Sequence, residues 1–123
     1  MSRRDVLIGS SNVVKGRARD EAHISLAGVA LRCVGGKLGA GADAAVSIRS
    51  HDIAISTAPP PHTENTVPAT VTRQVFLGGS RDYMVDLSDG TQLRIVTAAG
   101  DSIPAGSAVW LHLPADKCRA LTG

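Results

Sequence analysis

Two glycine-rich runs, each followed at once by a basic residue, are the parts of this sequence that could bind a small anion. They are Gly78-Gly79-Ser80-Arg81 and Gly35-Gly36-Lys37. Backbone N–H groups in such turns can converge on an oxyanion, and the adjacent Arg or Lys adds positive charge. Both runs also suit ordinary hairpin turns with solvated charges, in which Gly78 and Gly79 serve only the backbone geometry. The runs therefore predict either an oxyanion site or two simple turns.

A second candidate contact is the pair Arg49 and Asp52, which follows a predicted apolar strand over residues 45–49. Charged groups just beyond the end of a strand are well placed to contact a ligand or a partner protein. The alternative is a surface ion pair, which contributes only about 0–1 kcal/mol to stability. We treat Arg49 and Asp52 as candidate contact residues.

Motifs for nucleotide chemistry and for catalysis are missing from the sequence. Residues 39–44 fit a loose G-x-G-x-x-A pattern, but a strand is predicted after them, where a dinucleotide loop needs a helix N-terminus. Gly36-Lys37 lacks the upstream Gly and the following Ser or Thr of a phosphate loop. The four His residues are dispersed and show no metal-ligand spacing. The sequence thus predicts a protein that is not an enzyme, with no cofactor and no metal.

Composition indicates which class of partner to exclude and which residue types build the core. The 123 residues carry a net charge of +2 and only three aromatic residues, Phe76, Tyr83 and Trp110, which argues against nucleic-acid binding. We expect a core of Val, Ile, Leu and Ala, with Trp110 filling its second half. Cys33 and Cys118 have no metal spacing, and Cys33 is expected in the core. No secretion signal or apolar run of about 20 residues is present, which favours a cytoplasmic protein.

An internal repeat dominates the pattern of the chain. The run Gly28-Val29-Ala30-Leu31-Arg32-Cys33-Val34 returns as Gly90-Thr91-Gln92-Leu93-Arg94-Ile95-Val96, and an apolar strand follows each copy, at 45–49 and at 108–112. Alternating apolar residues predict strands, and Ala27-Gly28 and residues 88–91 are predicted hairpin turns. One helical turn is expected after Pro114.

These patterns predict an all-β fold made of closed or nearly closed small barrel lobes that form one compact domain. The expected divisions are a first lobe at 10–57, a proline-rich connector at 58–66 and a second lobe at 67–123.

Four segments, residues 8–12, 46–52, 71–83 and 110–118, carry short motifs in a fixed order. They match, in turn, the patterns F-[IL]-G-S-x-N, V-x-[IL]-R-P-E-[DH], V-x-x-x-x-[FY]-L-G-x-x-x-x-Y and a closing strand with a P-x-x-x-C turn. These patterns are those of the transport-associated OB (TOBE) region at the C-terminus of ABC importer ATPases, which the chain therefore resembles. The resemblance implies tandem OB-like small barrel lobes, and it implies that residues 1–9 are a boundary segment from an absent ATPase domain. Ser50 and His51 depart from the second pattern, in which Pro and an acidic residue stand. The importers of this type carry spermidine or putrescine, ferric iron, phosphonate or sugars.

The resemblance implies a regulatory or dimerisation accessory domain, non-catalytic on its own, that could sense substrate or a regulator. The implied partners are a second copy in a homodimer, the ATPase domain and the membrane permease subunits. The implied place is cytoplasmic, peripheral on the inner face of the cell membrane through the transporter. The alternative function is a stand-alone oxyanion-binding module of the molybdate type, since such modules use related tandem OB-like units.

Overall fold

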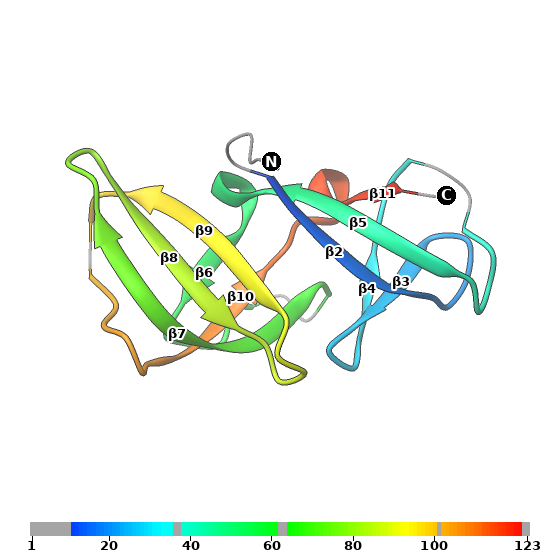
Figure 1. Ribbon diagram of the computed structural model, residues 1–123, viewed down its shortest axis with the longest axis horizontal. Coiled ribbons are helices and arrows are strands. Elements are labelled where there is room, and N and C mark those ends of the chain that lie inside the picture. Colours follow the sequence, from blue (N-terminus) through cyan, green and yellow to red (C-terminus); the bar gives the residue numbers. More distant parts are fainter. Residues whose placement is uncertain (1–10, 36–37, 62–63, 101, 122–123) are drawn as a thin grey trace, which may run out of the picture.

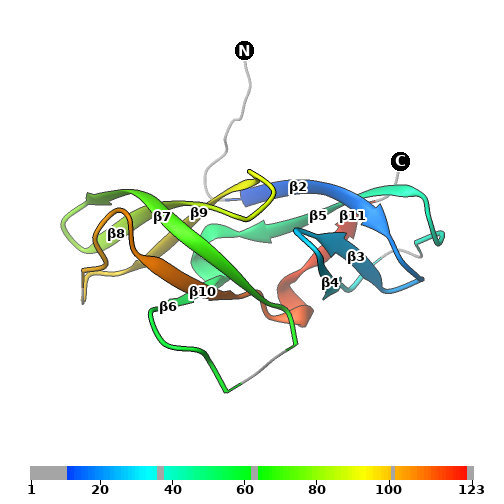
Figure 2. The ribbon, with the colours of Figure 1, turned by 90° about the horizontal axis from the view of Figure 1, so that it is seen from below.

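Short strands with alternating apolar and polar residues form two curled sheets, one toward each end of the molecule (Figures 1 and 2). The computed structural model describes residues 11–35, 38–61, 64–100 and 102–121. The all-β fold with two OB-like lobes that the sequence predicts is confirmed. The expected boundary segment 1–9 lies outside the described residues.

The first sheet has the strand order β11-β5-β2-β3-β4. Its strands are β2 (Ser11–Ala18), β3 (His23–Leu26), β4 (Val29–Arg32), β5 (Asp43–Arg49) and β11 (Arg119–Leu121). An isolated parallel bridge between Val34, just beyond β4, and Arg119 of β11 joins the two edges. We call this bridge the seam, because it closes the first sheet on itself.

The second sheet has the order β6-β10-β7-β8-β9. Its strands are β6 (Ala54–Ser56), β7 (Thr66–Phe76), β8 (Ser80–Asp86), β9 (Gln92–Ala98) and β10 (Ala108–His112). The register of β7 against β8 shifts between Val71 and Arg73, so the inward and outward positions of β7 exchange there.

The two sheets repeat one topology. In each, a three-stranded meander (β2-β3-β4 or β7-β8-β9) is joined by a strand that pairs back with the first strand of the meander, β5 or β10. The copies seen in the sequence lie at equivalent places, because each begins at the turn before the last strand of a meander. The internal repeat is therefore a repeat of structure.

The fifth strand of each sheet comes from the other half of the chain. β6 follows β5 in sequence but pairs with β10, and β11 follows β10 but pairs with β5. The expected limits 10–57 and 67–123 divide the chain by sequence, whereas the sheets exchange these two strands. The reason is that 3-10 turns, η1 (Ser50–Asp52) and η2 (Ala115–Lys117), follow β5 and β10 and direct the chain toward the other sheet. η2 lies where one helical turn was predicted after Pro114.

The predicted hairpin turns are present. Leu26 pairs with Val29 across Ala27 and Gly28, and both turn residues have positive φ, at 49° and 82°. Between β8 and β9, Gly90 has a φ of 88°, and the N–H of Leu87 donates to the carbonyl of Thr91. Only a residue without a side chain adopts such a φ at little cost, so Gly90 fixes this turn.

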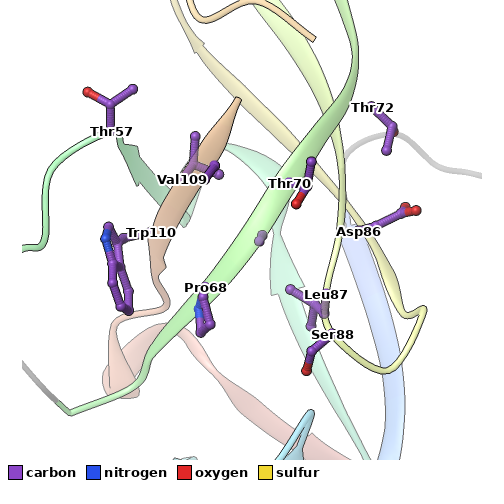
Figure 3. Close-up of a pocket in the computed structure, with 11 residues that line it drawn as sticks. Thr57, Pro68, Thr70, Thr72, Asp86, Leu87, Ser88, Val109 and Trp110 are labelled. Atoms are coloured by element: carbon purple, nitrogen blue, oxygen red, sulfur yellow. The ribbon is translucent and has the colours of Figure 1, made fainter. Parts of the chain in front are cut away.

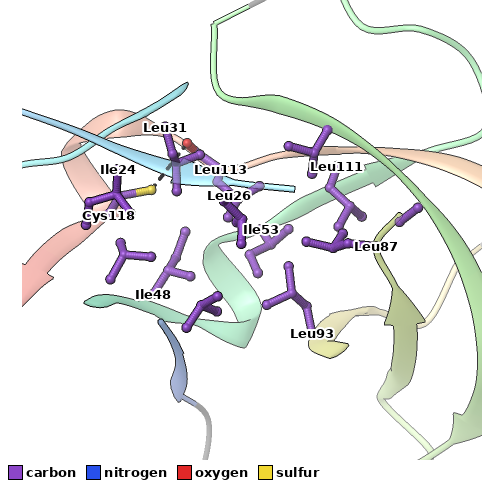
Figure 4. Packing of buried hydrophobic residues seen from close by; sticks show 14 of the residues in the cluster. Ile24, Leu26, Leu31, Ile48, Ile53, Leu87, Leu93, Leu111, Leu113 and Cys118 are labelled. Carbon is purple, nitrogen blue, oxygen red and sulfur yellow. Dashed lines mark hydrogen bonds between the residues drawn. The ribbon is translucent and has the colours of Figure 1, made fainter. Parts of the chain in front are cut away.

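One cluster of buried aliphatic residues runs through both lobes (Figure 4). It is built from Val, Ile, Leu and Ala, as expected, together with Tyr83, Cys33 and Cys118. The expectation for Trp110 is wrong: it is only half-buried and lies on an outer face, because its neighbours Val109 and Leu111 take the inward positions of β10. The cluster makes the two lobes one packing unit.

Asn65 joins the two lobes at the end of the proline-rich connector. It is buried, has a φ of 53°, and its Oδ1 accepts from the N–H of Arg32 at 2.8 Å. Its Nδ2 donates to the carbonyls of Arg32 at 2.8 Å and of Leu113 at 2.9 Å. The amide thus pairs backbone groups from both halves of the chain.

Candidate functional site

A polar pocket of about 540 Å³ lies on the outer face of the first sheet, where β5 leads into η1 and η2 leads into β11. Strand pairing explains how it forms. Ser47 of β5 is opposite Val13 on one side and Arg119 on the other, and Arg49 is opposite Ser11. Successive residues of a strand alternate between faces, so Ser47 and Arg49 share the outer face. The residues lining this polar pocket are Ser11, Val34, Ser47, Ile48, Arg49, His51, Asp52, Asp116, Lys117 and Arg119.

The charges of the polar pocket favour an anion. Among the described residues, three cationic side chains line it, those of Arg49, Lys117 and Arg119, and all three residues are exposed. Two carboxylates, Asp52 and Asp116, oppose them, so the described lining residues have an excess of one positive charge before any charge on His51. Ser11 and Ser47 add hydroxyl donors. A small oxyanion accepts hydrogen bonds from guanidinium, ammonium and hydroxyl groups of this kind.

The turn η1 fixes one side of the polar pocket and packs on β9 of the other lobe. Ser50 is buried inside it, and its Oγ has no hydrogen-bond partner within the described part of the chain. His51 and Asp52 follow on the pocket side, with His51 Nε2 3.9 Å from Asp52 Oδ1. The second lobe therefore supports the position of two lining residues.

Asn12, next to Ser11, links the strand at the polar pocket to the second lobe. Its Oδ1 accepts from the N–H of Arg94 and its Nδ2 donates to the carbonyl of Arg94, each at 2.8 Å. The Arg94 side chain in turn donates from Nε and Nη2 to Asp82, at 2.7–3.0 Å. The bonds to that carboxylate raise the pKa of Arg94. Asn12 thus ties β2 to β9 beside the site.

The run Gly78-Gly79-Ser80-Arg81 lies apart from this pocket, at the tip of the β7–β8 hairpin (Figure 1). Gly78 has the positive φ that the turn requires, at 83°, and the N–H of Gly79 donates to the carbonyl of Leu77. Arg81 Nη1 donates to Gln74 Oε1 at 2.8 Å, and its guanidinium lies 4.9 Å from the centre of the Phe76 ring. Contacts within the hairpin thus already occupy Arg81.

The structure brings Arg49 and Asp52 together in one pocket but does not join them to Gly78, Gly79, Ser80 and Arg81. Of the other glycine-rich run, Gly35 is described, whereas residues 36–37 lie outside the described residues. Sequence reasoning missed Lys117 and Arg119. Lys117 and Arg119 lie near Arg49 because Arg119 pairs with Ser47. This pairing exists because β11, from the second half of the chain, joins the first sheet. The alternation of strand 45–49 could have indicated Ser47.

A second groove, of about 530 Å³, crosses the outer face of the second sheet (Figure 3). Trp110 and Pro68 lie on one side of it and Asp86 on the other, with Thr70 and Thr72 along β7. Asp86 is the one charged residue among its lining residues. A carboxylate repels an anion, so this groove is less suited to an oxyanion than the polar pocket is.

Within residues 11–35, 38–61, 64–100 and 102–121, no three His, Cys, Asp or Glu residues are grouped so that they could hold a metal ion. Over the same residues, no helix has the length and apolar character that crossing a membrane requires.

Comparison with known proteins gives a family and a structural relative. The family model of the TOBE domain matches residues 46–121, which is more than half of the chain. No curated protein matches the sequence. Among solved structures, the cytoplasmic molybdate-binding protein ModG, crystallised with molybdate bound, has a TM-score of 0.79 and 16% sequence identity, over 94% of this chain and 98% of that one. This likeness shows a shared fold across both lobes.

Proposed function

Because the chain belongs to the TOBE domain family, we propose that it is a binding module that holds a small tetrahedral oxyanion in the polar pocket and is not itself an enzyme. The observation that carries the proposal is the grouping of Arg49, Lys117 and Arg119 on one sheet face. Molybdate is the ligand to test first, since ModG shares the fold and was crystallised with it.

The chemistry of the lining residues supports an oxyanion over other ligands. A guanidinium presents paired N–H donors to two oxygens at once, and an ammonium adds a point charge. The two arginines and the lysine supply both kinds of donor from different elements, β5, β11 and η2. The carboxylates of Asp52 and Asp116 offset part of this positive charge. Charge alone therefore attracts an anion only weakly, and binding depends on directed hydrogen bonds from the lining residues.

We further propose that a second copy of the chain covers the polar pocket in a homodimer. In the part of the chain that the structure describes, five large apolar side chains are exposed, and three of them lie beside it on the first lobe: Val13, Val34 and Leu121, at 62%, 41% and 38% exposure. Val13 and Val34 lie in one row with Ser47 and Arg119, and Leu121 is in the next row. Apolar surface next to an open polar site suits an interface. Light scattering over a concentration series tests this; a strict monomer with and without molybdate would contradict it.

A second candidate function is the regulatory or dimerisation domain of an ABC importer ATPase, which the match to the TOBE family favours. In that setting the partners are the ATPase domain and the permease subunits, and the place is the cytoplasmic face of the cell membrane. The reading frame upstream of Met1 distinguishes the two functions. A phosphate loop and a Walker-B acid encoded there would support the importer function.

Calorimetric titration with molybdate, tungstate, sulfate and phosphate tests the oxyanion proposal. Replacement Arg49→Gln removes a donor of the polar pocket, and we expect it to weaken binding at least about tenfold, the value of one charged hydrogen bond. Arg81→Gln, at the hairpin tip, is the matched control and leaves affinity unchanged. The reverse result would assign the anion to the Gly78–Arg81 turn. No heat with any of the four anions would refute the proposal.

A further inference from the structure

Two buried thiols lie side by side beneath the seam of the first lobe. The N–H of Val34 donates to the carbonyl of Cys118, and the N–H of Ala120 donates to the carbonyl of Val34, both at 2.8 Å. These two bonds define the parallel bridge between Val34 and Arg119. Cys33 and Cys118 are the residues just before each bridge partner, so they are neighbours across the seam.

Both side chains point to the same side. Val34 and Arg119 are exposed, whereas Cys33 and Cys118 have exposures of 6% and 0%. Alternation along each segment therefore turns both thiols into the core (Figure 4, which shows Cys118). Neighbouring strands are about 4.8 Å apart, within the range of about 4.4–6.8 Å between Cα atoms that a disulfide spans.

Each buried thiol makes weak hydrogen bonds within the core, and Cys118 Sγ also accepts from Asn65 Nδ2 at 3.8 Å. Cys33 Sγ donates to the carbonyl of Leu31 at 3.4 Å, and Cys118 Sγ donates to the carbonyl of Leu113 at 3.5 Å. Burial raises the pKa of Cys33 to about 11. Burial, and then the nearby Cys33, raises that of Cys118 to about 12. Oxidation is therefore slow at neutral pH and accelerates as the thiolate fraction grows.

We propose that Cys33 and Cys118 are a redox pair whose intramolecular disulfide latches the seam. The oxidant is a small disulfide such as glutathione disulfide. One cysteine thiolate attacks it and releases one glutathione thiolate; the second cysteine thiolate then attacks the mixed disulfide and releases the other. Two protein thiols are oxidised and one glutathione disulfide is reduced to two thiols. Parting of the two hydrogen bonds of the seam admits the oxidant, and reclosure brings the sulfurs together.

The latch bears on the polar pocket because Val34, Lys117 and Arg119, the neighbours of the two cysteines, line it. In the reduced protein two backbone hydrogen bonds of Val34, with Cys118 and Ala120, hold the seam that carries these residues, and in the oxidised protein a covalent bond holds it as well. An effect on anion affinity rests on the proposed function, whereas formation of the disulfide does not.

The test incubates the folded, reduced protein with glutathione disulfide at mildly alkaline pH, followed by thiol titration and intact-mass analysis. We expect loss of both thiols, a mass lower by two hydrogen atoms, and a proteolytic fragment that links Cys33 to Cys118. The melting temperature is expected to rise by about 10 °C, since the bond closes a long loop. Variants Cys33→Ala and Cys118→Ala are the controls and form only a glutathione adduct.

Disulfide formation that needs urea, or that yields only adducts or disulfide-linked dimers, would overturn the proposal. Circular dichroism on the Ala variants checks that they fold, and the mass of the wild-type protein answers the question even where they do not. None of these measurements involves an anion. Failure of the disulfide to form can therefore be distinguished from failure of the protein to bind an oxyanion.

Discussion

At the scale of single residues, Asn65 shows how one amide can join two halves of a chain. It stands in the predicted proline-rich connector, where it is buried and pairs with backbone groups of Arg32 and Leu113. Asn is among the few residues other than Gly that adopt a positive φ, which here is 53°. The link between the two halves of the chain therefore requires both the side-chain amide of Asn65 and its positive φ.

Asn65→Ala tests this double requirement. It leaves the N–H of Arg32 and two carbonyls without these partners and strains the positive φ, so the free energy of unfolding should fall by about 4 kcal/mol. Asn65→Gly loses the same bonds without the strain, and should cost about 1 kcal/mol less. Urea unfolding measures both. Equal stability of the Ala variant and the wild type would show that these bonds contribute little.

At the scale of elements, β2 and β3 approach each other closely at Gly16. A Cβ there would lie 2.5 Å from the carbonyl oxygen of Ser25 and 2.7 Å from Ile24 Cγ2. Neither group can retreat easily, because β3 is also paired with β4. The absence of a side chain at Gly16 is what allows the first meander to curl.

Gly16→Ala is therefore expected to destabilise the protein by about 2 kcal/mol, as overpacked sites do. Gly79→Ala is the matched control: no atom lies within 4 Å of its added Cβ, so its effect should stay within about 0.5 kcal/mol. Thermal unfolding compares the two. If Gly79→Ala is the more harmful change, the hairpin tip is under a constraint that its geometry does not show.

The elements themselves could largely be predicted from the sequence, because a period of two and the turn residues are local signals. The strands over the two repeat copies and at 45–49 and 108–112, the hairpins at Ala27-Gly28 and Gly90 and the single turn after Pro114 follow from such signals. The pairing of β6 with β10 and of β11 with β5 could not. A strand of three residues has too few alternating positions to indicate which sheet edge it joins. Lys117 and Arg119 were therefore missed as neighbours of Arg49.

At the scale of the whole molecule, the buried thiols make the free energy of unfolding fall as the pH becomes alkaline. The ordinary thiol pKa of 9.0 applies to the unfolded chain, while burial raises it to about 11 for Cys33 and about 12 for Cys118. Below pH 9 both states keep their protons and this stability is complete. Above it the unfolded chain ionises first, so stability is lost as pH rises toward the folded values.

The expected loss is up to about 1.4 kcal/mol per pH unit for each thiol between pH 9 and about 11. Urea unfolding of the reduced protein at pH 8 to about 11 measures the slope, with Cys33→Ala as the comparison. The variant should lose stability less steeply with pH than the wild type. Parallel slopes would mean that ionisation of Cys33 is not coupled to unfolding.

The exchange of β6 and β11 also sets the order in which a ribosome can deliver complete lobes. The second lobe has all five strands once β10 has emerged, since β6 was made long before. The first lobe, begun earlier, waits for Arg119–Leu121. Its nascent strands β2 to β5 must therefore remain without their fifth strand until all five strands of the second lobe have been made. For the same time the polar pocket lacks Lys117 and Arg119.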